Sequence, residues 1–264
     1  MAEMTMMMMM RVRGGIGAFG LFPPGGQQLV TTRESSSSSF KTRTRSKAVV
    51  VERCKMPRRK QEKLPVLLFD IMDTIVRDPF YEDVPRFFGM SFKELIDSKH
   101  PSSWVDFEKG IIDEMELARN FFKDGRSFDL EGLKKCMMNG YSYIDGVQEL
   151  LCALKRNNYD MHAFTNYPIW YNLIEEKLSV SRYLSWTFCS CVTGKRKPDP
   201  DFYLDALRLL EVDPENCIFI DDRLGNVEAA IQVGMKGLQF KNADLLRADL
   251  SQLGIHLSSN EQYI

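Results

Sequence analysis

The 264-residue sequence contains no apolar run as long as the ~18 residues that a membrane-spanning helix needs. It also has almost no net charge, because 35 Lys and Arg residues are balanced by 36 Asp and Glu residues. Without an excess of positive charge the chain has no general field with which to hold nucleic acid or an acidic lipid surface. We therefore expect neither a nucleic-acid partner nor a membrane partner.

The six cysteines are too scattered for the disulfide framework of a small secreted protein, so reduced thiols are expected. Cys189 and Cys191 form a Cys-x-Cys pair, but no second pair and no nearby histidine completes a zinc site. Alternation along a buried strand explains this pair better than metal binding does.

The charge is unevenly distributed, since residues 1–60 hold 12 basic and only 3 acidic side chains. This segment also contains a Gly/Pro-rich patch and the serine run Ser35–Ser39, a composition typical of an organellar transit peptide. We expect a transit peptide without a fixed fold that directs the protein to the chloroplast stroma, with the mitochondrion as the alternative. A disordered basic tail is the alternative to a transit peptide. The G-x-G-x-x-G match at Gly15–Gly20 lacks a preceding strand, so we do not interpret it as a dinucleotide site.

From Leu64 onward, short apolar runs alternate with segments of helical periodicity. The expected strands are 66–69, 162–165, 186–190, 218–220 and 237–240. The expected helices between and after them are 147–156, 169–178, 201–211, 226–233 and 243–253. This alternation predicts an α/β fold, a Rossmann-like open parallel sheet with helices on both faces.

Residues 77–145 interrupt this alternation, because they contain helical patterns but no convincing strand. The expected helices are 91–98, 103–112, 114–124 and 129–138. We predict that 77–145 is a helical cap inserted after the first strand, and that 61–76 and 146–264 together form the α/β core.

Open α/β sheets bind ligands at the carboxyl ends of their strands, and four of these ends are polar here. The segments are Asp70 to Thr74, Thr165-Asn166, Lys195 to Pro200 and Asp221-Asp222-Arg223. Together they offer a nucleophile, hydrogen-bond donors, an ammonium group and a carboxylate pair, which are the parts that phosphoryl transfer requires. Each segment alone could be an ordinary helix cap or turn, but their joint chemistry favours an active site.

The order and spacing of these four segments resemble the haloacid dehalogenase superfamily over residues 64–254. The strings that carry the resemblance are LLFDIMDTIVRDPFYEDVPRFFGM, FTNYPIWYN, FCSCVTGKRKPDPDFYLDAL and CIFIDDRLGNVEAA. Within the superfamily they are similar to plant chloroplast hydrolases of flavin mononucleotide (FMN). The resemblance implies a phosphatase whose small-molecule substrate is a phosphomonoester, most directly FMN, which is converted to riboflavin and phosphate.

The resemblance also implies roles for individual residues. Asp70 is the expected nucleophile and forms an aspartyl-phosphate. Thr165 holds a phosphoryl oxygen through its hydroxyl group, with Asn166 alongside. Lys197 neutralises the charge on Asp70 and on the phosphoryl group.

The implied cofactor is Mg²⁺, bound by Asp70, the main-chain carbonyl of Met72 and Asp222, with Asp221 nearby and Asn226 in an outer role. A divalent ion is also expected on physical grounds, because three carboxylates and a phosphate would otherwise repel one another in one crevice.

Met72 departs from the superfamily pattern. Phosphatases of this kind usually have an Asp at that position, which protonates the leaving oxygen and later activates water. A thioether can do neither, so we expect Asp73, or a metal-bound or ordered water, to supply the proton. We also expect Tyr167 or Trp170 to bind the flavin ring.

Three alternatives remain at this point: a phosphatase for another small molecule such as a sugar phosphate, a hydrolytic dehalogenase, and a binding protein that has kept the fold and lost the chemistry. A dehalogenase would make Met72 unsurprising. The Asp221-Asp222 pair favours a phosphatase, because a dehalogenase has no need of a divalent ion.

Overall fold

The computed structural model describes residues 64–257, which lie in one compact unit assigned to residues 58–264. The predicted transit peptide, residues 1–60, lies outside the described residues. Within the described range, no helix combines the length and the apolar character that crossing a membrane requires.

Five parallel strands form one sheet in the order β3-β2-β1-β4-β5. They are β1 (Val66–Phe69), β2 (Met161–Thr165), β3 (Ser185–Cys189), β4 (Cys217–Asp221) and β5 (Lys236–Gln239). The central strand β1 pairs Phe69 with Ala163 on one side and with Ile220 on the other. Strands β2 and β4 are buried along their whole length, as expected for parallel strands covered on both faces.

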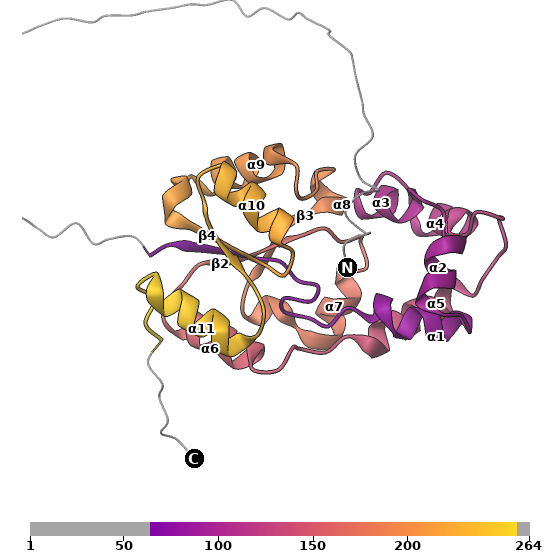
Figure 1. Ribbon diagram of the computed structural model, residues 1–264, viewed down its shortest axis with the longest axis horizontal. Helices are drawn as coiled ribbons and strands as arrows, with labels where there is room; N and C mark the ends of the chain where they lie inside the picture. The colour runs from indigo at the N-terminus through magenta and orange to yellow at the C-terminus, as the bar shows by residue number, and fades with distance from the viewer. Residues whose placement is uncertain (1–63, 258–264) are drawn as a thin grey trace, which may run out of the picture. The chain divides into compact units, whose positions relative to one another are not determined.

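Helices cover both faces of this sheet (Figure 1). One face is covered by α9 (Pro200–Leu210) and α10 (Leu224–Gln232), the other by α6 (Val147–Arg156), α7 (Tyr171–Leu178) and α11 (Ala243–Gln252). Short elements complete the core: α8 (Ser190–Thr193), η3 (Val180–Arg182) and η4 (Pro214–Asn216). Each face has its own apolar cluster, and the predicted open parallel α/β fold is confirmed.

Residues 77–145, called the inserted segment below, contain only helices apart from isolated bridges. They are η2 (Pro79–Tyr81), α1 (Asp83–Phe88), α2 (Phe92–Ser98), α3 (Ser103–Glu108), α4 (Glu114–Asn120) and α5 (Leu130–Gly140). Capping boxes begin α2 at Ser91 and α4 at Asp113. In each, the cap side chain accepts a hydrogen bond from the N3 amide, and the side chain of the glutamate at N3 accepts one from the cap amide. Helix α1 was not expected from the sequence.

Helix α3 ends four residues before the expected residue 112, because Gly110 lies there in the left-handed region at φ +67°. A Cβ atom at Gly110 would collide with the main-chain oxygen of Cys191 in α8. Glycine at this position therefore lets the inserted segment approach the core closely.

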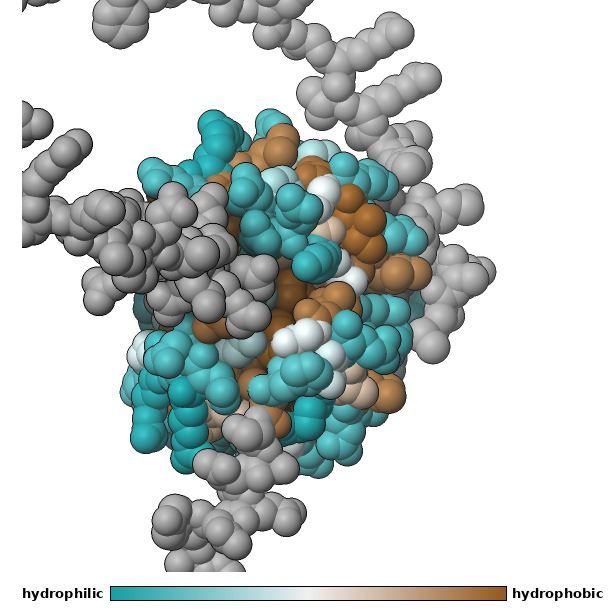
Figure 2. Space-filling model, turned by 90° about the vertical axis from the view of Figure 1, so that its left-hand side faces the viewer, coloured by the Kyte–Doolittle hydropathy of each residue, from teal (hydrophilic) through white to brown (hydrophobic). Residues whose placement is uncertain are grey.

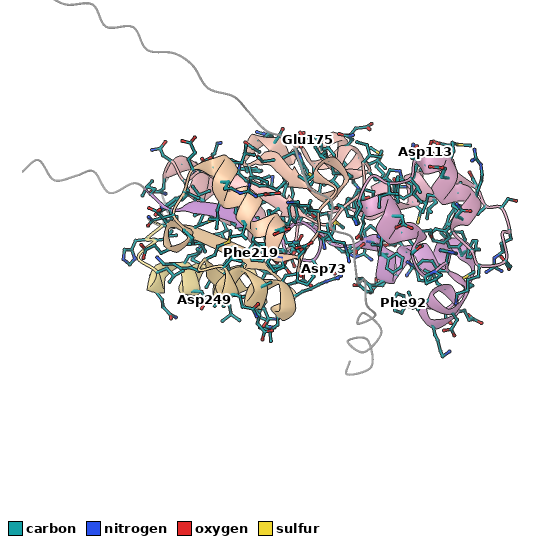
Figure 3. All side chains as sticks on the ribbon, turned by 90° about the horizontal axis from the view of Figure 1, so that it is seen from above. Asp73, Phe92, Asp113, Glu175, Phe219 and Asp249 are labelled. Carbon is teal, nitrogen blue, oxygen red and sulfur yellow. The ribbon has the colours of Figure 1, made fainter. Side chains whose placement is uncertain are left out.

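The inserted segment lies at the carboxyl ends of the strands, and Figure 3 shows Asp73 at the junction between the strands and the inserted helices. Figure 2 shows the opposite end of the sheet, where hydrophilic side chains surround smaller apolar areas. The polar strand ends identified in the sequence thus lie on the side that faces the inserted helices.

Candidate active site

Three charged side chains meet at the carboxyl ends of β1 and β4. The Lys197 ammonium lies 2.8 Å from Asp70 Oδ1 and 2.7 Å from Asp221 Oδ2. All three residues are buried, with 7% of Asp70, 2% of Lys197 and none of Asp221 exposed. Asp70 follows β1 directly, and its amide donates to Ile220 O in the neighbouring strand at 2.9 Å. The parallel register therefore brings the ends of β1 and β4 to one place.

Burial and neighbouring charge set the proton affinities of this group. Burial raises the pKa of Asp70 to about 6; the Lys197 charge opposes the rise and Asp221 adds to it. Burial alone would lower the pKa of Lys197, but the charges of Asp221 and Asp70 outweigh it, so this pKa lies above its ordinary value. Lys197 therefore remains an ammonium, and Asp70 is available as a carboxylate near neutral pH.

Asn166 holds the main chain of Lys197 on both sides. Its Oδ1 accepts from the Lys197 amide at 2.8 Å, and its Nδ2 donates to the Lys197 carbonyl at 2.9 Å. Since both ends of the side-chain amide are engaged, Asn166 orients Lys197 in this conformation. A direct contact of Asn166 with substrate stays a prediction.

Asp222 offers an oxygen that suits a cation. Its Oδ1 is buried without a hydrogen-bond partner among the described residues, and one carboxylate oxygen each from Asp70, Asp221 and Asp222 lie within 4.8 Å of one another. Burial raises the pKa of Asp222 to about 7, and the charges of Asp70 and Asp221 add to this. Thr74 fixes the main chain here, because its hydroxyl accepts from the Asp222 amide at 3.1 Å.

The two neighbouring carboxylates are used differently. Both oxygens of Asp221 already accept hydrogen bonds, one from the Arg223 amide, one from Lys197, and both from Asn226 Nδ2. Asp221 is therefore suited to hold Lys197, whereas Asp70 and Asp222 have oxygens left for a cation. The carbonyl of Met72 receives no hydrogen bond from any described residue, so its oxygen is also free to bind a cation.

Thr165 ends β2 with a side chain that has no partner. The residue is completely buried, and its hydroxyl makes no hydrogen bond within the described part of the chain. An unsatisfied buried hydroxyl normally costs free energy, and at a strand end this one is available to a ligand. Binding of a phosphoryl oxygen by Thr165 stays a prediction.

Tyr167 and Trp170 lie under the inserted segment. Only 3% of Tyr167 and 1% of Trp170 are exposed. The Tyr167 hydroxyl pairs with the Tyr141 hydroxyl at 2.7 Å, and the Trp170 indole donates to Glu114 Oε1 at 2.6 Å. Both rings are thus covered in this conformation, and flavin binding by either stays a prediction.

A second link between the inserted segment and the core was not apparent in the sequence. Glu108 in α3 is 8% exposed; its Oε2 lies 2.9 Å from Arg196 Nη2, and its Oε1 accepts from the Trp104 indole at 2.7 Å. Ser190 adds a hydrogen bond from its hydroxyl to the Glu108 carbonyl. Since Arg196 precedes Lys197, this link connects the inserted segment to the lysine that pairs with Asp70 and Asp221. The only signal in the sequence was the position of Arg196 beside Lys197.

Comparisons with known proteins agree with this geometry. Residues 65–234 match the family of haloacid dehalogenase-like hydrolases. The chain is 66% identical over 199 residues to flavin mononucleotide hydrolase 1, chloroplastic, of Arabidopsis thaliana, covering 75% of this chain and 81% of that protein. It is 26% identical to a glyceraldehyde 3-phosphate phosphatase of Pyrococcus furiosus over 211 residues, covering 71% and 85% of the two chains.

A solved structure shares the fold. A haloacid dehalogenase family enzyme of Bacteroides thetaiotaomicron, in a magnesium complex, superimposes with a TM-score of 0.58 at 18% identity, covering 70% of this chain and 98% of that chain. The resemblance inferred from the four motifs is confirmed.

Proposed function

This chain belongs to the haloacid dehalogenase-like hydrolases and is a phosphoric monoester hydrolase, and we propose that it hydrolyses FMN to riboflavin and phosphate through an aspartyl-phosphate on Asp70. The observation that carries the mechanism is the buried Asp70–Lys197–Asp221 group beside the unpartnered oxygen of Asp222. The substrate rests on the 66% identity to the Arabidopsis FMN hydrolase.

In the first step, a carboxylate oxygen of Asp70 attacks phosphorus and the bond between phosphorus and the ester oxygen breaks. The Lys197 ammonium compensates charge on Asp70 and on the phosphoryl oxygens, and the Thr165 hydroxyl donates to one of those oxygens. The leaving oxygen of riboflavin is an alkoxide, so it must receive a proton.

In the second step, water attacks the phosphoryl group held on Asp70. Its oxygen bonds to phosphorus, the bond from phosphorus to the Asp70 oxygen breaks, and phosphate and the free carboxylate result. Asp221 keeps Lys197 in place throughout, because it holds the ammonium at 2.7 Å.

The donor set suits Mg²⁺, which prefers carboxylate, carbonyl and water oxygens. Asp70, the Met72 carbonyl and Asp222 would bind it. Asp221 would lie beside these ligands, and Asn226 would hold Asp221 through the hydrogen bonds from its Nδ2. When bound, the ion supplies compensation for the negative charge of the phosphoryl oxygens and the carboxylates. The same concentration of carboxylates disfavours the dehalogenase alternative.

We propose that the inserted segment is the cap over this site and selects the substrate. Aromatic side chains are concentrated there, and Phe80 and Trp104 stack with ring centroids 6.1 Å apart. Tyr167 and Trp170 remain candidate flavin contacts that become accessible when the inserted segment moves. For the location we propose the chloroplast stroma, on the basis of the basic, serine-rich residues 1–60 and the chloroplastic relative.

The proposal is tested by phosphate release from a panel of phosphomonoesters, with Mg²⁺ and with a chelator, using the full chain. We expect FMN among the best substrates, and activity that disappears with chelator and returns with Mg²⁺. Asp70→Asn should abolish release, whereas Asp213→Asn changes an exposed carboxylate at the amino end of β4 and should not.

Two outcomes would contradict separate parts of the proposal. If another ester is hydrolysed and FMN is not, the substrate is wrong and the phosphatase class stands. If chelation leaves the rate unchanged, the magnesium requirement is wrong.

A further inference from the structure

The residues closest in sequence to the nucleophile do not provide the proton that the leaving group needs. Met72 is buried in the apolar cluster and carries no acidic proton. Asp73 is used to shape the loop, because its Oδ1 accepts from the Asp78 amide at 3.0 Å and its own amide donates to Val76 O at 2.7 Å. Asp73 also lies in the left-handed region at φ +56°, which aspartate adopts more readily than most residues.

The same hydrogen bond fixes Asp78 where the chain leaves the core for the inserted segment. Asp78 is the N-cap of η2, and its Oδ1 accepts from the Phe80 amide at 2.9 Å. Its second carboxylate oxygen accepts no hydrogen bond from any residue that the structure describes. One oxygen of Asp78 is therefore structural, and the other is available for chemistry.

Asp78 lies where the loop after the nucleophile meets the inserted helices, because its amide donates to Asp73 and its side chain caps η2. Arg223, which directly follows Asp222, donates from Nη2 to the Tyr81 hydroxyl at 3.3 Å and so joins the strand end to the η2 turn that Asp78 caps. The turn that carries Asp78 therefore lies next to the residues that follow β4.

The surroundings of Asp78 favour a carboxyl that can gain and lose a proton. Burial raises the pKa of Asp78 to about 7; the hydrogen bond from Phe80 and the charge of Arg223 oppose the rise, and the charges of Asp73 and Glu108 add to it. The charge of Asp78 in turn helps to raise the pKa of Tyr141 and of Tyr167, whose hydroxyls pair with each other.

We propose that Asp78 is the general acid and base that replaces the missing carboxyl at Met72. In the first step its proton passes to the ester oxygen while the bond from that oxygen to phosphorus breaks. In the second step the resulting carboxylate accepts a proton from the water that attacks the phosphoryl group, which restores the acid. This inference rests on the proposed phosphatase mechanism. The competing interpretation is that Asp78 only caps η2.

The test compares two leaving groups in Asp78→Asn. Asparagine keeps the capping oxygen but has no acidic proton. FMN and glycerol phosphate have alkoxide leaving groups that need protonation, whereas para-nitrophenolate leaves without it. In single-turnover mixing with Mg²⁺, we expect release of the alcohols to fall by about 10²- to 10⁴-fold, and first-turnover release of para-nitrophenol to fall by less than about threefold. With para-nitrophenyl phosphate, phosphorylated Asp70 should then accumulate, because the first step remains fast and the water that attacks in the second step lacks its base.

Asp73→Asn tests the other carboxyl of the loop, because asparagine keeps the acceptor for the Asp78 amide and tolerates a positive φ. Asp129→Asn is the matched control, because it makes the same change at another capping aspartate of the inserted segment, whose Oδ1 accepts from the Gly132 amide at 2.9 Å. We expect less than about a threefold change with any of the esters. Asp78→Ser also keeps a cap and removes the carboxyl, and it takes the place of the asparagine variant if thermal unfolding shows that the latter is poorly folded.

Equal losses with both kinds of leaving group, or no loss, would show that Asp78 only caps η2. A loss for alkyl esters in Asp73→Asn alone would assign the role to Asp73. Failure of FMN as a substrate overturns only the proposed substrate, because glycerol phosphate still tests Asp78; an inactive wild type would overturn both.

Discussion

The strand ends and the inserted segment are built on different principles. At the strand ends, opposite charges are buried and paired at short distance, as Lys197 is with Asp70 and Asp221. The inserted segment is built largely from aromatic rings packed edge to face, and it is tied to the core by the polar links of Glu108 and Glu114. This difference is the basis for our proposal that the strand ends perform the phosphoryl chemistry and that the inserted segment governs access and proton supply.

Among the changes that test this comparison, removing the Lys197 ammonium should produce the largest effect. Lys197→Met leaves Asp70 and Asp221 buried without their counter-charge. We expect kcat to fall by about 10²- to 10³-fold, as when one preorganised donor is removed from a reacting group. Lys195→Met removes a neighbouring ammonium that pairs with Asp205 near the surface, and it should change kcat less than about twofold.

Steady-state kinetics of both variants, with circular dichroism as the check on folding, decide this prediction. A folded Lys197→Met variant that retains kcat within about tenfold of the wild type would contradict the electrostatic role.

The strand ends could be predicted from the sequence because their signals are local. The bounds of β1 match the expected 66–69, and the residues after it, after β3 and after β4 meet as the rule for parallel sheets requires. Asn166 shows the limit of this reasoning. Its position at the end of β2 was predicted correctly, but its hydrogen bonds with the Lys197 main chain depend on a residue 31 positions away.

The inserted segment was less predictable because its bounds are set by tertiary contacts. Helix α4 was expected to reach residue 124 but ends at Asn120, where Phe122 forms a bridge with Lys99. The link between Glu108 and Arg196 spans 88 positions and follows no periodic pattern. Contacts of this kind leave no signature in a single sequence.

Weakening the link between the two regions should have an intermediate effect. Glu108→Gln removes the charge that pairs with Arg196 but keeps an acceptor for the Trp104 indole. Hydrogen bonds to charged groups contribute about 1.5–3 kcal/mol, so we expect kcat/KM for FMN to fall by about tenfold, chiefly through KM. Asp205→Asn breaks a charge pair near the surface of the α/β core, away from the inserted segment, and should change kcat/KM less than about twofold.

Comparable values for Glu108→Gln and the wild type would show that the inserted segment stays in place without this ion pair. The polar link from Trp170 to Glu114 would then be the one to remove next.

The smallest expected effect concerns the stability of the metal-free protein. Burial raises the pKa of Asp222 to about 7, so the folded state holds a proton there at pH values at which the unfolded chain has lost it. The free energy of unfolding must therefore fall as pH rises from about 4 to about 7, because the folded state binds more protons.

Mg²⁺ bound to ionised Asp222 offsets this loss of stability. We expect Mg²⁺ to raise Tm by about 2–4 °C more at about pH 8 than at about pH 5.5. Thermal unfolding with chelator and with Mg²⁺ measures this difference, and Asp222→Asn should abolish most of it. A Tm increment that does not depend on pH would place the bound ion away from Asp222.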